Sequence, residues 1–247
     1  MNAHSLKKVK ELMMTNNQNA DNNTTTLGSI IPIKLGFVYS YLVKTDDSYI
    51  LIDTGYSRKR KDLVLELETK GIQSRNLKLI ILTHQDFDHT GNAAYLRNKY
   101  DTKIAMHNKD AEAVERGDML WNRKGRNVVT RVVFKFLLVI LRMRKFQKFK
   151  PDILLSDGEN LSSFGLDATI LHLPGHSKGS IGILTAKGEL LCGDLFMNNK
   201  KPDKSSLVDR KEDLNASIEK LRHFEISTVY PGHGEPFLLE DFFKSTC

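Results

Sequence analysis

The sequence is poor in cysteine and has no long hydrophobic run. Two cysteines, Cys192 and Cys247, are too few for a disulfide framework, and we expect both thiols to be reduced. No stretch approaches the roughly 18 consecutive apolar residues of a membrane-spanning helix. No apolar segment follows the N-terminal lysines, which disfavours a secretory signal. These absences argue against a disulfide-stabilised secreted domain and an integral membrane protein, and they predict a cytoplasmic location.

Acidic residues are missing from one segment. The 247-residue chain has a formal net charge of +7, yet residues 119–150 contain ten Lys or Arg and no Asp or Glu. Within this segment, 128–145 has the spacing of an amphipathic helix with its basic residues opposite a broad apolar face. We interpret 119–150 as a basic helical insertion that caps the domain. Docking of 128–145 on an anionic membrane surface is the alternative. Nucleic-acid contact is disfavoured, because aromatic residues do not alternate with the arginines.

The length and the 40% hydrophobic content suit one sizeable core. Residues 1–26 end in a tract of Asn, Asp and Thr with too little apolar surface to offset chain entropy, so we expect a flexible tail there. Residues 27–247 form the predicted domain. Its strands come in runs, with helices between the runs rather than after every strand. This order favours two sheets with helices outside them, an α/β sandwich.

Four potential metal ligands lie within six residues, directly after the apolar stretch 79–82. They are His84, Asp86, Asp88 and His89. Imidazole nitrogen and carboxylate oxygen are ligands for divalent transition metals. A single such hexapeptide also fits a polar loop, so the further motifs decide between the two interpretations.

Three later motifs also follow short apolar runs. They carry His176 after Pro174-Gly175, Asp194 after Gly193, and His233 after Pro231-Gly232. Ligands at the ends of neighbouring strands converge along one edge of a sheet, because strands lie about 4.8 Å apart. The sequence therefore predicts a two-metal hydrolytic centre.

These motifs resemble the metallo-β-lactamase superfamily between about Ile30 and Phe237, with H-x-D-x-D-H in place of the usual H-x-H-x-D-H. The resemblance implies a four-layer αββα sandwich. It also implies that His84, Asp86 and His176 hold one metal, that Asp88, His89 and His233 hold the second, and that Asp194 bridges both. Asp53 is implied as a residue that orients ligands. The other histidines, at positions 4, 107, 172 and 223, are expected to have structural or surface roles.

Asp86 departs from the family pattern, which has histidine at this position. A third carboxylate lowers the net charge of a two-metal site from +2 to +1, and a bound water should then be less acidic. The oxygen-richer ligand set keeps zinc as the first expectation and admits manganese or iron. A direct ligand role for Asp86 is expected, with an indirect role as the alternative.

The expected activity is hydrolysis of a small molecule at a lactone, ester, thioester or amide carbonyl. Metal-activated hydroxide would be the nucleophile, with Asp88 to orient it or move its proton. The lactonase and hydroxyacylglutathione-hydrolase branches are the nearest in motif order, but Met197 stands where the lactonases typically have tyrosine. A phosphodiesterase or nuclease of the same fold is one alternative, and a non-catalytic binding module is another. Cys192 is interpreted as part of a packed strand.

Overall fold

The computed structural model describes residues 29–121, 123 and 147–245. The predicted tail at 1–26 and the predicted helix at 128–145 lie outside these residues. Among the described residues, no helix is long and apolar enough to cross a bilayer.

The first sheet is built from the N-terminal half of the chain, in sequence order. The first three strands are antiparallel neighbours, and the third to the sixth are parallel. The strands are β1 (Ile30–Lys34), β2 (Tyr39–Lys44), β3 (Tyr49–Ile52), β4 (Leu77–Leu82), β5 (Lys103–His107) and β6 (Ile153–Leu155).

The second sheet comes from the C-terminal half and has the order β12-β11-β9-β8-β7, with β10 paired to β9. The β9–β11 pair is parallel and the other pairs are antiparallel. The strands are β7 (Ala168–His172), β8 (Ile181–Thr185), β9 (Glu189–Asn198), β10 (Asp203–Lys204), β11 (Thr228–Gly234) and β12 (Phe237–Leu238).

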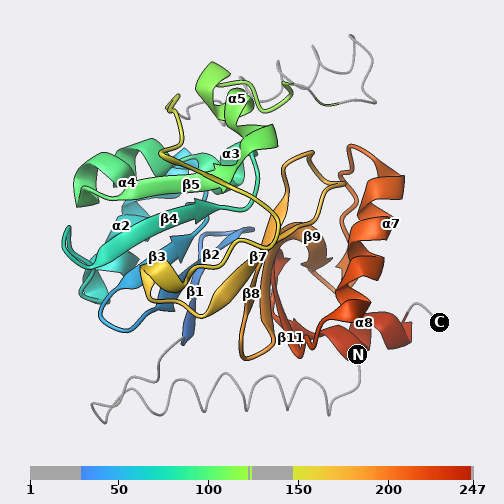
Figure 1. The fold of residues 1–247 in the computed structure, drawn as a ribbon. Coiled ribbons are helices and arrows are strands. Elements are labelled where there is room, and N and C mark those ends of the chain that lie inside the picture. Colours follow the sequence, from blue (N-terminus) through green and yellow to red (C-terminus); the bar gives the residue numbers. More distant parts are fainter. Residues whose placement is uncertain (1–28, 122, 124–146, 246–247) are drawn as a thin grey trace.

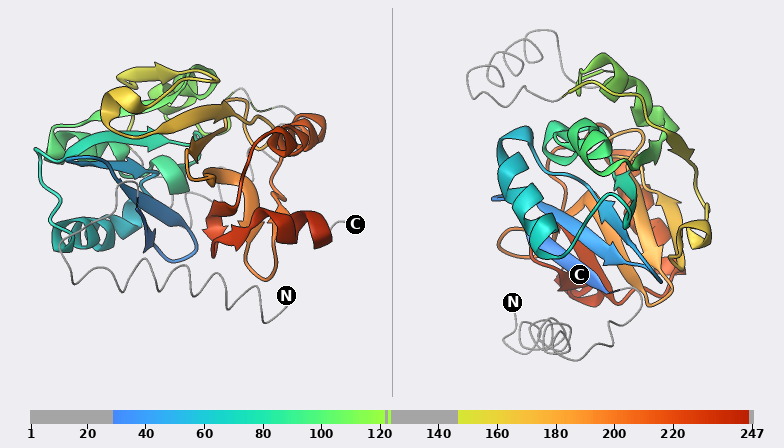
Figure 2. Two further views of the ribbon diagram at one scale, coloured as in Figure 1. Left: turned by 60° about the horizontal axis from the view of Figure 1, so that its bottom comes forward. Right: turned by 90° about the vertical axis from the view of Figure 1, so that its left-hand side faces the viewer.

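Helices cover the outer face of each sheet (Figures 1 and 2). Helices α2 (Arg60–Thr69) and α4 (Ala93–Tyr100) share a buried apolar cluster with the first sheet. Helices α7 (Lys211–Lys220) and α8 (Leu239–Ser245) do the same for the second. A third cluster lies between the sheets and joins residues such as Ile50 and Ile81 to Ile170 and Ile183. The predicted four-layer αββα sandwich is confirmed.

Short elements complete the described part of the chain. The helices α3 (Phe87–Thr90) and α5 (Asn108–Arg116) follow β4 and β5, and 3-10 turns span Ser57–Lys59, Ser162–Phe164 and Leu221–His223.

Two strands extend further than the apolar pattern indicates. The β-rich runs 189–192 and 228–230 of the sequence predict strands that end at Cys192 and Tyr230, but β9 continues to Asn198 and β11 continues to Gly234. The parallel pairing between them resumes after irregularities around Pro231, with His233 opposite Met197. Gly193 has φ +51°, a conformation that glycine adopts at no steric cost, and it lets β9 pass against Thr83. Asp194 therefore projects from within a strand rather than from the loop after it.

Candidate metal centre

The turn after β4 places four candidate ligands together. His84 follows the strand, and Asp86 is the N-cap residue of α3. The backbone N–H groups of His89 and Thr90 donate to the Asp86 carbonyl at 3.0 and 2.9 Å. This single helical turn carries Asp88 and His89 toward the same side as His84, so ligands adjacent in sequence reach different parts of one centre.

The seven predicted ligands converge in three overlapping groups, each with its ligand atoms within 4.8 Å of one another. The groups are His84, Asp86 and His176; His84, His89 and Asp194; and Asp88, His89 and His233.

Asp194 contacts residues of both outer groups. One carboxylate oxygen is 3.2 Å from His89 Nε2, and the other is 3.4 Å from His233 Nε2 and 3.8 Å from His176 Nε2. This is the geometry that a bridging ligand needs.

All four imidazoles are held by their Nδ1 atoms. A carboxylate or carbonyl oxygen can only accept a hydrogen bond, so the hydrogen in such a contact is on Nδ1. The Nε2 atom then faces the centre. The partners are the Asp53 carboxylate for His89 (2.7 Å), the Leu207 carbonyl for His176 (2.6 Å), the Phe37 carbonyl for His233 (2.7 Å) and the Thr83 hydroxyl for His84 (3.0 Å).

Asp53 organises two of these contacts. Its carboxylate accepts from the Thr83 backbone N–H and hydroxyl at 2.8 and 2.7 Å, and the hydroxyl then accepts from His84. Asp53 has φ +57°, which is strained for most residues but tolerated by Asp and Asn. The orienting role that the resemblance implies for Asp53 matches these contacts.

Several buried polar atoms point into the centre without a hydrogen-bond partner. They are His84 Nε2, together with His89 Nε2 and Asp194 Oδ1, which lie 3.2 Å apart without the alignment of a hydrogen bond. Leaving such atoms unpaired is costly, and a cation bound between them removes the cost. Gly232 lies against them, since a Cβ there would approach Asp194 Oδ1 to 2.5 Å. The residues therefore fit divalent metal ions.

The electrostatics differ across the centre. Burial, together with the neighbouring His89 and His176, holds the pKa of His84 well below its usual value. Burial also acts to lower the pKa of His89, but the Asp194 and Asp53 carboxylates outweigh it and raise that pKa well above normal. Asp194 likewise overcomes burial at His233 and raises its pKa to about 10.

Sequence reasoning missed Arg123. It assigned this residue to the basic segment, but the structure places its guanidinium against the Asp86 carboxylate, and the side chain is only 9% exposed. A carboxylate in place of the usual histidine was the one available signal that a cation is needed nearby.

The remaining histidines stay outside the centre. His107 and His172 stack on one another with ring centroids 4.2 Å apart, and His223 lies in a 3-10 turn. His4 lies outside the described residues.

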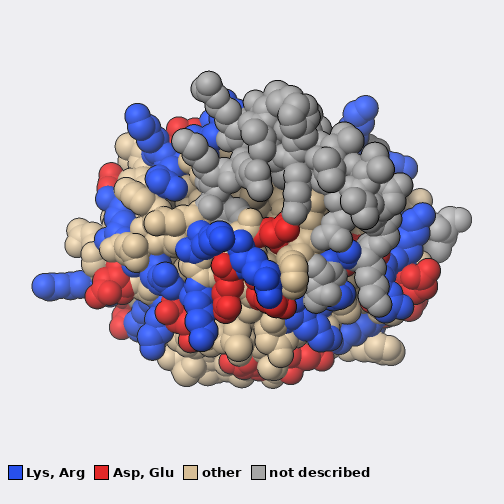
Figure 3. All heavy atoms as spheres, turned by 90° about the horizontal axis from the view of Figure 1, so that it is seen from above, with Lys and Arg blue, Asp and Glu red and all other residues tan. Residues whose placement is uncertain are grey.

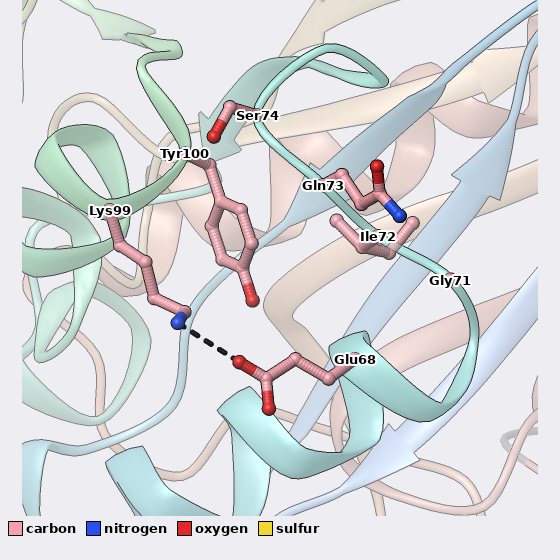
Figure 4. A pocket seen from close by; sticks show the side chains of 7 residues that line it. All are labelled: Glu68, Gly71, Ile72, Gln73, Ser74, Lys99 and Tyr100. Carbon is pink, nitrogen blue, oxygen red and sulfur yellow. Dashed lines mark ion pairs between the residues drawn. The ribbon is translucent and has the colours of Figure 1, made fainter.

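A separate hollow of about 390 Å³ lies beside residues 71–74, the segment that precedes β4 (Figure 4). Glu68 and Lys99 form an ion pair beside it, and the Tyr100 hydroxyl points toward it. Its lining contains no histidine or cysteine, so it has no ligand set for a transition metal.

The model of the metallo-beta-lactamase superfamily matches residues 33–233. The chain belongs to this superfamily. It is 28% identical over 221 residues to human "Acyl-coenzyme A thioesterase MBLAC2", covering 83% of this chain and 75% of the relative. It is 29% identical over 201 residues to "Probable metallo-hydrolase MJ0888" of Methanocaldococcus jannaschii, covering 79% and 87%.

Solved structures agree with this membership. The crystal structure of TTHA1623 in a di-iron-bound form has a TM-score of 0.63 and 26% identity, covering 85% of this chain and 95% of that one. A metallo-beta-lactamase family protein of Thermus thermophilus has a TM-score of 0.66 at 20% identity, covering 88% and 77%. The prediction of a dinuclear metal-dependent hydrolase is confirmed by the family and by the ligand groups together.

Proposed function

We propose that this protein hydrolyses a small-molecule carbonyl ester, with thioesters as the first substrate class. The observation that carries the proposal is the set of four imidazoles whose Nδ1 atoms are all fixed, so that their Nε2 atoms meet three carboxylates. Such a set is arranged for two cations before any cation arrives.

In this proposal the two outer ligand groups hold one metal each. His84, Asp86 and His176 hold the first metal, Asp88, His89 and His233 hold the second, and Asp194 contacts both. When bound, two such ions supply a water of lowered pKa and a Lewis acid for the carbonyl oxygen. Zinc is the first expectation, with manganese or iron admitted by Asp86.

Asp88 is the residue best placed to handle the proton of the attacking water. Its side chain is 23% exposed, whereas those of Asp86 and Asp194 are 7% exposed. Its Oδ2 lies 3.4 Å from His233 Nε2, so it faces both solvent and the centre. An incoming carbonyl group can therefore meet Asp88 without displacing the buried ligands.

The chain offers no cysteine nucleophile at the centre within its described residues. Cys192 is 2% exposed, and burial raises the pKa of its thiol to about 12. A direct attack of water on the carbonyl is therefore favoured over a covalent thioester intermediate.

The thioester preference draws support from the human relative, which is named as an acyl-coenzyme A thioesterase. Met197, at the position where lactonases typically have tyrosine, agrees with placing lactones second. A phosphodiesterase is less favoured by the one face that Figure 3 shows from above. The described residues visible there mix Lys and Arg with Asp and Glu instead of presenting one sign of charge.

A hydrolysis panel with metal analysis tests this proposal. The full chain, loaded separately with Zn, Mn or Fe, is assayed on acyl-coenzyme A thioesters, oxygen esters, a homoserine lactone and a phosphodiester reporter. We expect two metals per chain, fastest turnover of a thioester, and loss of turnover on chelation. Turnover of the phosphodiester alone would favour the nuclease alternative, and near-zero metal after growth in supplemented medium would favour a binding module.

A further inference from the structure

The two oxygens of Asp86 have different partners. Oδ2 faces the first ligand group, 3.2 Å from His176 Nε2 and 3.8 Å from His84 Nε2. Oδ1 pairs with the guanidinium of Arg123. Because the guanidinium is on the far oxygen, it does not occupy the space between the three candidate ligands. Asp86 thus has one oxygen for a metal and one for a protein cation.

The segment that carries Arg123 is fixed to the ligand turn next to Asp86. The side-chain amide of Gln85 donates to the Met119 carbonyl at 2.6 Å. Phe87, on the other side of Asp86, packs in one buried cluster with Met119 and Leu120. Three consecutive residues of the turn, 85–87, therefore contact Met119, Leu120 and Arg123. These contacts determine where the guanidinium lies.

The charge of Arg123 is directed at Asp86. A guanidinium stays protonated even when it is buried, so the side chain of Arg123 brings a full positive charge to this position. The buried carboxylate of Asp110 already accepts from the Ser177 hydroxyl and from two backbone N–H groups. The guanidinium forms its ion pair with Asp86, whose side chain is as deeply buried as its own.

We propose that Arg123 is a positioning residue that forms one unit with Asp86 and makes this carboxylate a stand-in for the usual neutral imidazole. The pair has no net charge and presents a single ligand atom, and both are properties of an imidazole. Without the guanidinium, the second oxygen is free to join the metal and the site gains negative charge. Both changes favour manganese over zinc. The inference rests on the two-metal centre proposed above.

Replacing Arg123 tests the metal preference without a substrate. For the full chain and its variants, the dissociation constants of Zn and of Mn are measured separately by competition with a chelator. In Arg123→Met we expect the ratio of the two constants to shift toward manganese by about 10–100-fold, the usual effect of removing a partner of a ligand. Arg123→Lys keeps the charge but not the planar fork, so its shift should be smaller. Arg222→Met removes an exposed guanidinium paired with Glu219 and should leave the ratio unchanged.

A double-variant cycle supplies the second readout. In Asp86→His the guanidinium loses its carboxylate and lies buried beside an imidazole, so zinc binding should weaken. In Asp86→His with Arg123→Met, zinc binding should recover to near the original value, because the unit has been replaced as a whole.

The outcomes separate this inference from the proposed function. If the original chain binds no metal, the proposed function fails. If it binds two metals, but Arg123→Met leaves the Zn-to-Mn ratio unchanged or the two substitutions are additive, only the role of Arg123 is overturned. Thermal melting of each metal-free variant checks folding. Should Arg123→Met alone not fold, two measurements still test the role of Arg123. They are the Zn-to-Mn ratio of Arg123→Lys and the zinc affinity of Asp86→His with and without the second substitution.

Discussion

The two outer ligand groups have similar side chains but balance their charges in opposite ways. Around His84, Asp86 and His176 the protein supplies its own cation, Arg123, and the pKa of His84 is lowered. Around Asp88, His89 and His233 no arginine or lysine pairs with these ligands among the described residues, and nearby carboxylates raise the pKa of both histidines.

The family motif thus accommodates Asp86 in place of histidine. The first group pairs its added carboxylate with a guanidinium from a neighbouring segment, whereas the second keeps the family's residues and relies on Asp53 behind them. The raised pKa values of His89 and His233 favour competition between protons and a metal at the second group, so we expect metal affinity there to depend more strongly on pH.

Removing the Asp194 carboxylate should disrupt both ligand groups, since this carboxylate contacts residues of each. Asp194→Ala is expected to release both metals and lower kcat/KM by about 10³-fold or more, because the metals contribute several kcal/mol to the transition state. Elemental analysis and thioester hydrolysis measure the two effects. Asp167→Ala, an exposed aspartate, is the control. Retention of two metals with activity within tenfold of the original would contradict the bridging role.

Asp53→Asn should weaken metal binding at the second group more than at the first. Asparagine tolerates the left-handed backbone at this position, so the fold should persist. The His89 contact loses its charge, and we expect the affinity of one metal to fall by about 10–100-fold while the other changes less. Calorimetric titration of metal-free protein resolves the two events. An equal loss at both would show that Asp53 supports the whole centre, and Asp47→Asn provides an exposed control.

The stacked pair His107–His172 lies outside both ligand groups, so it shows how buried histidines that are not proposed ligands make stability depend on pH. Burial, with His172 close by, lowers the pKa of His107 to about 4. Between about pH 6.5 and 4, His107 is protonated in the unfolded chain but neutral in the folded chain. Its contribution to the free energy of unfolding is therefore lost as the pH falls through this range.

His107→Asn keeps a side chain suited to cap α5 and removes the titration. The original chain should lose about 1–2 kcal/mol more than this variant between pH 7 and pH 4.5. Urea unfolding at several pH values measures the difference, and parallel curves would contradict the assignment.

The smallest effect on stability and activity is expected at the exposed Lys34–Glu235 ion pair. Lys34 pairs with Glu235, two residues after His233, and both side chains are more than half exposed. Lys34→Met should change the free energy of unfolding by at most about 0.5 kcal/mol and leave kcat/KM within twofold. A larger change in kcat/KM would show that the charge of Glu235 reaches the second group.

The sequence predicts the layers and the seven converging ligands because each motif follows an apolar strand. The β-rich runs 49–52, 77–82 and 168–172 of the sequence predict strands, and β3, β4 and β7 have these bounds. The continuation of β9 and β11 through their motifs was not predictable from apolar patterning, since glycine and proline at 193 and 231 normally end a strand.

Arg123 could not be assigned either, because its partner is chosen by the packing of Gln85 and Phe87 on residues 119–121. The proposed ligand roles and the helix at 128–145 stay predictions.

The ligands come from both halves of the sandwich: one turn after β4, and three positions in or beside the second sheet. A cation held there ties the N-terminal half to the C-terminal half, and its release becomes part of unfolding. At a free concentration 100 times the dissociation constant, one such ion adds about 2.7 kcal/mol. Resistance to proteolysis should therefore report metal occupancy even before a substrate is known.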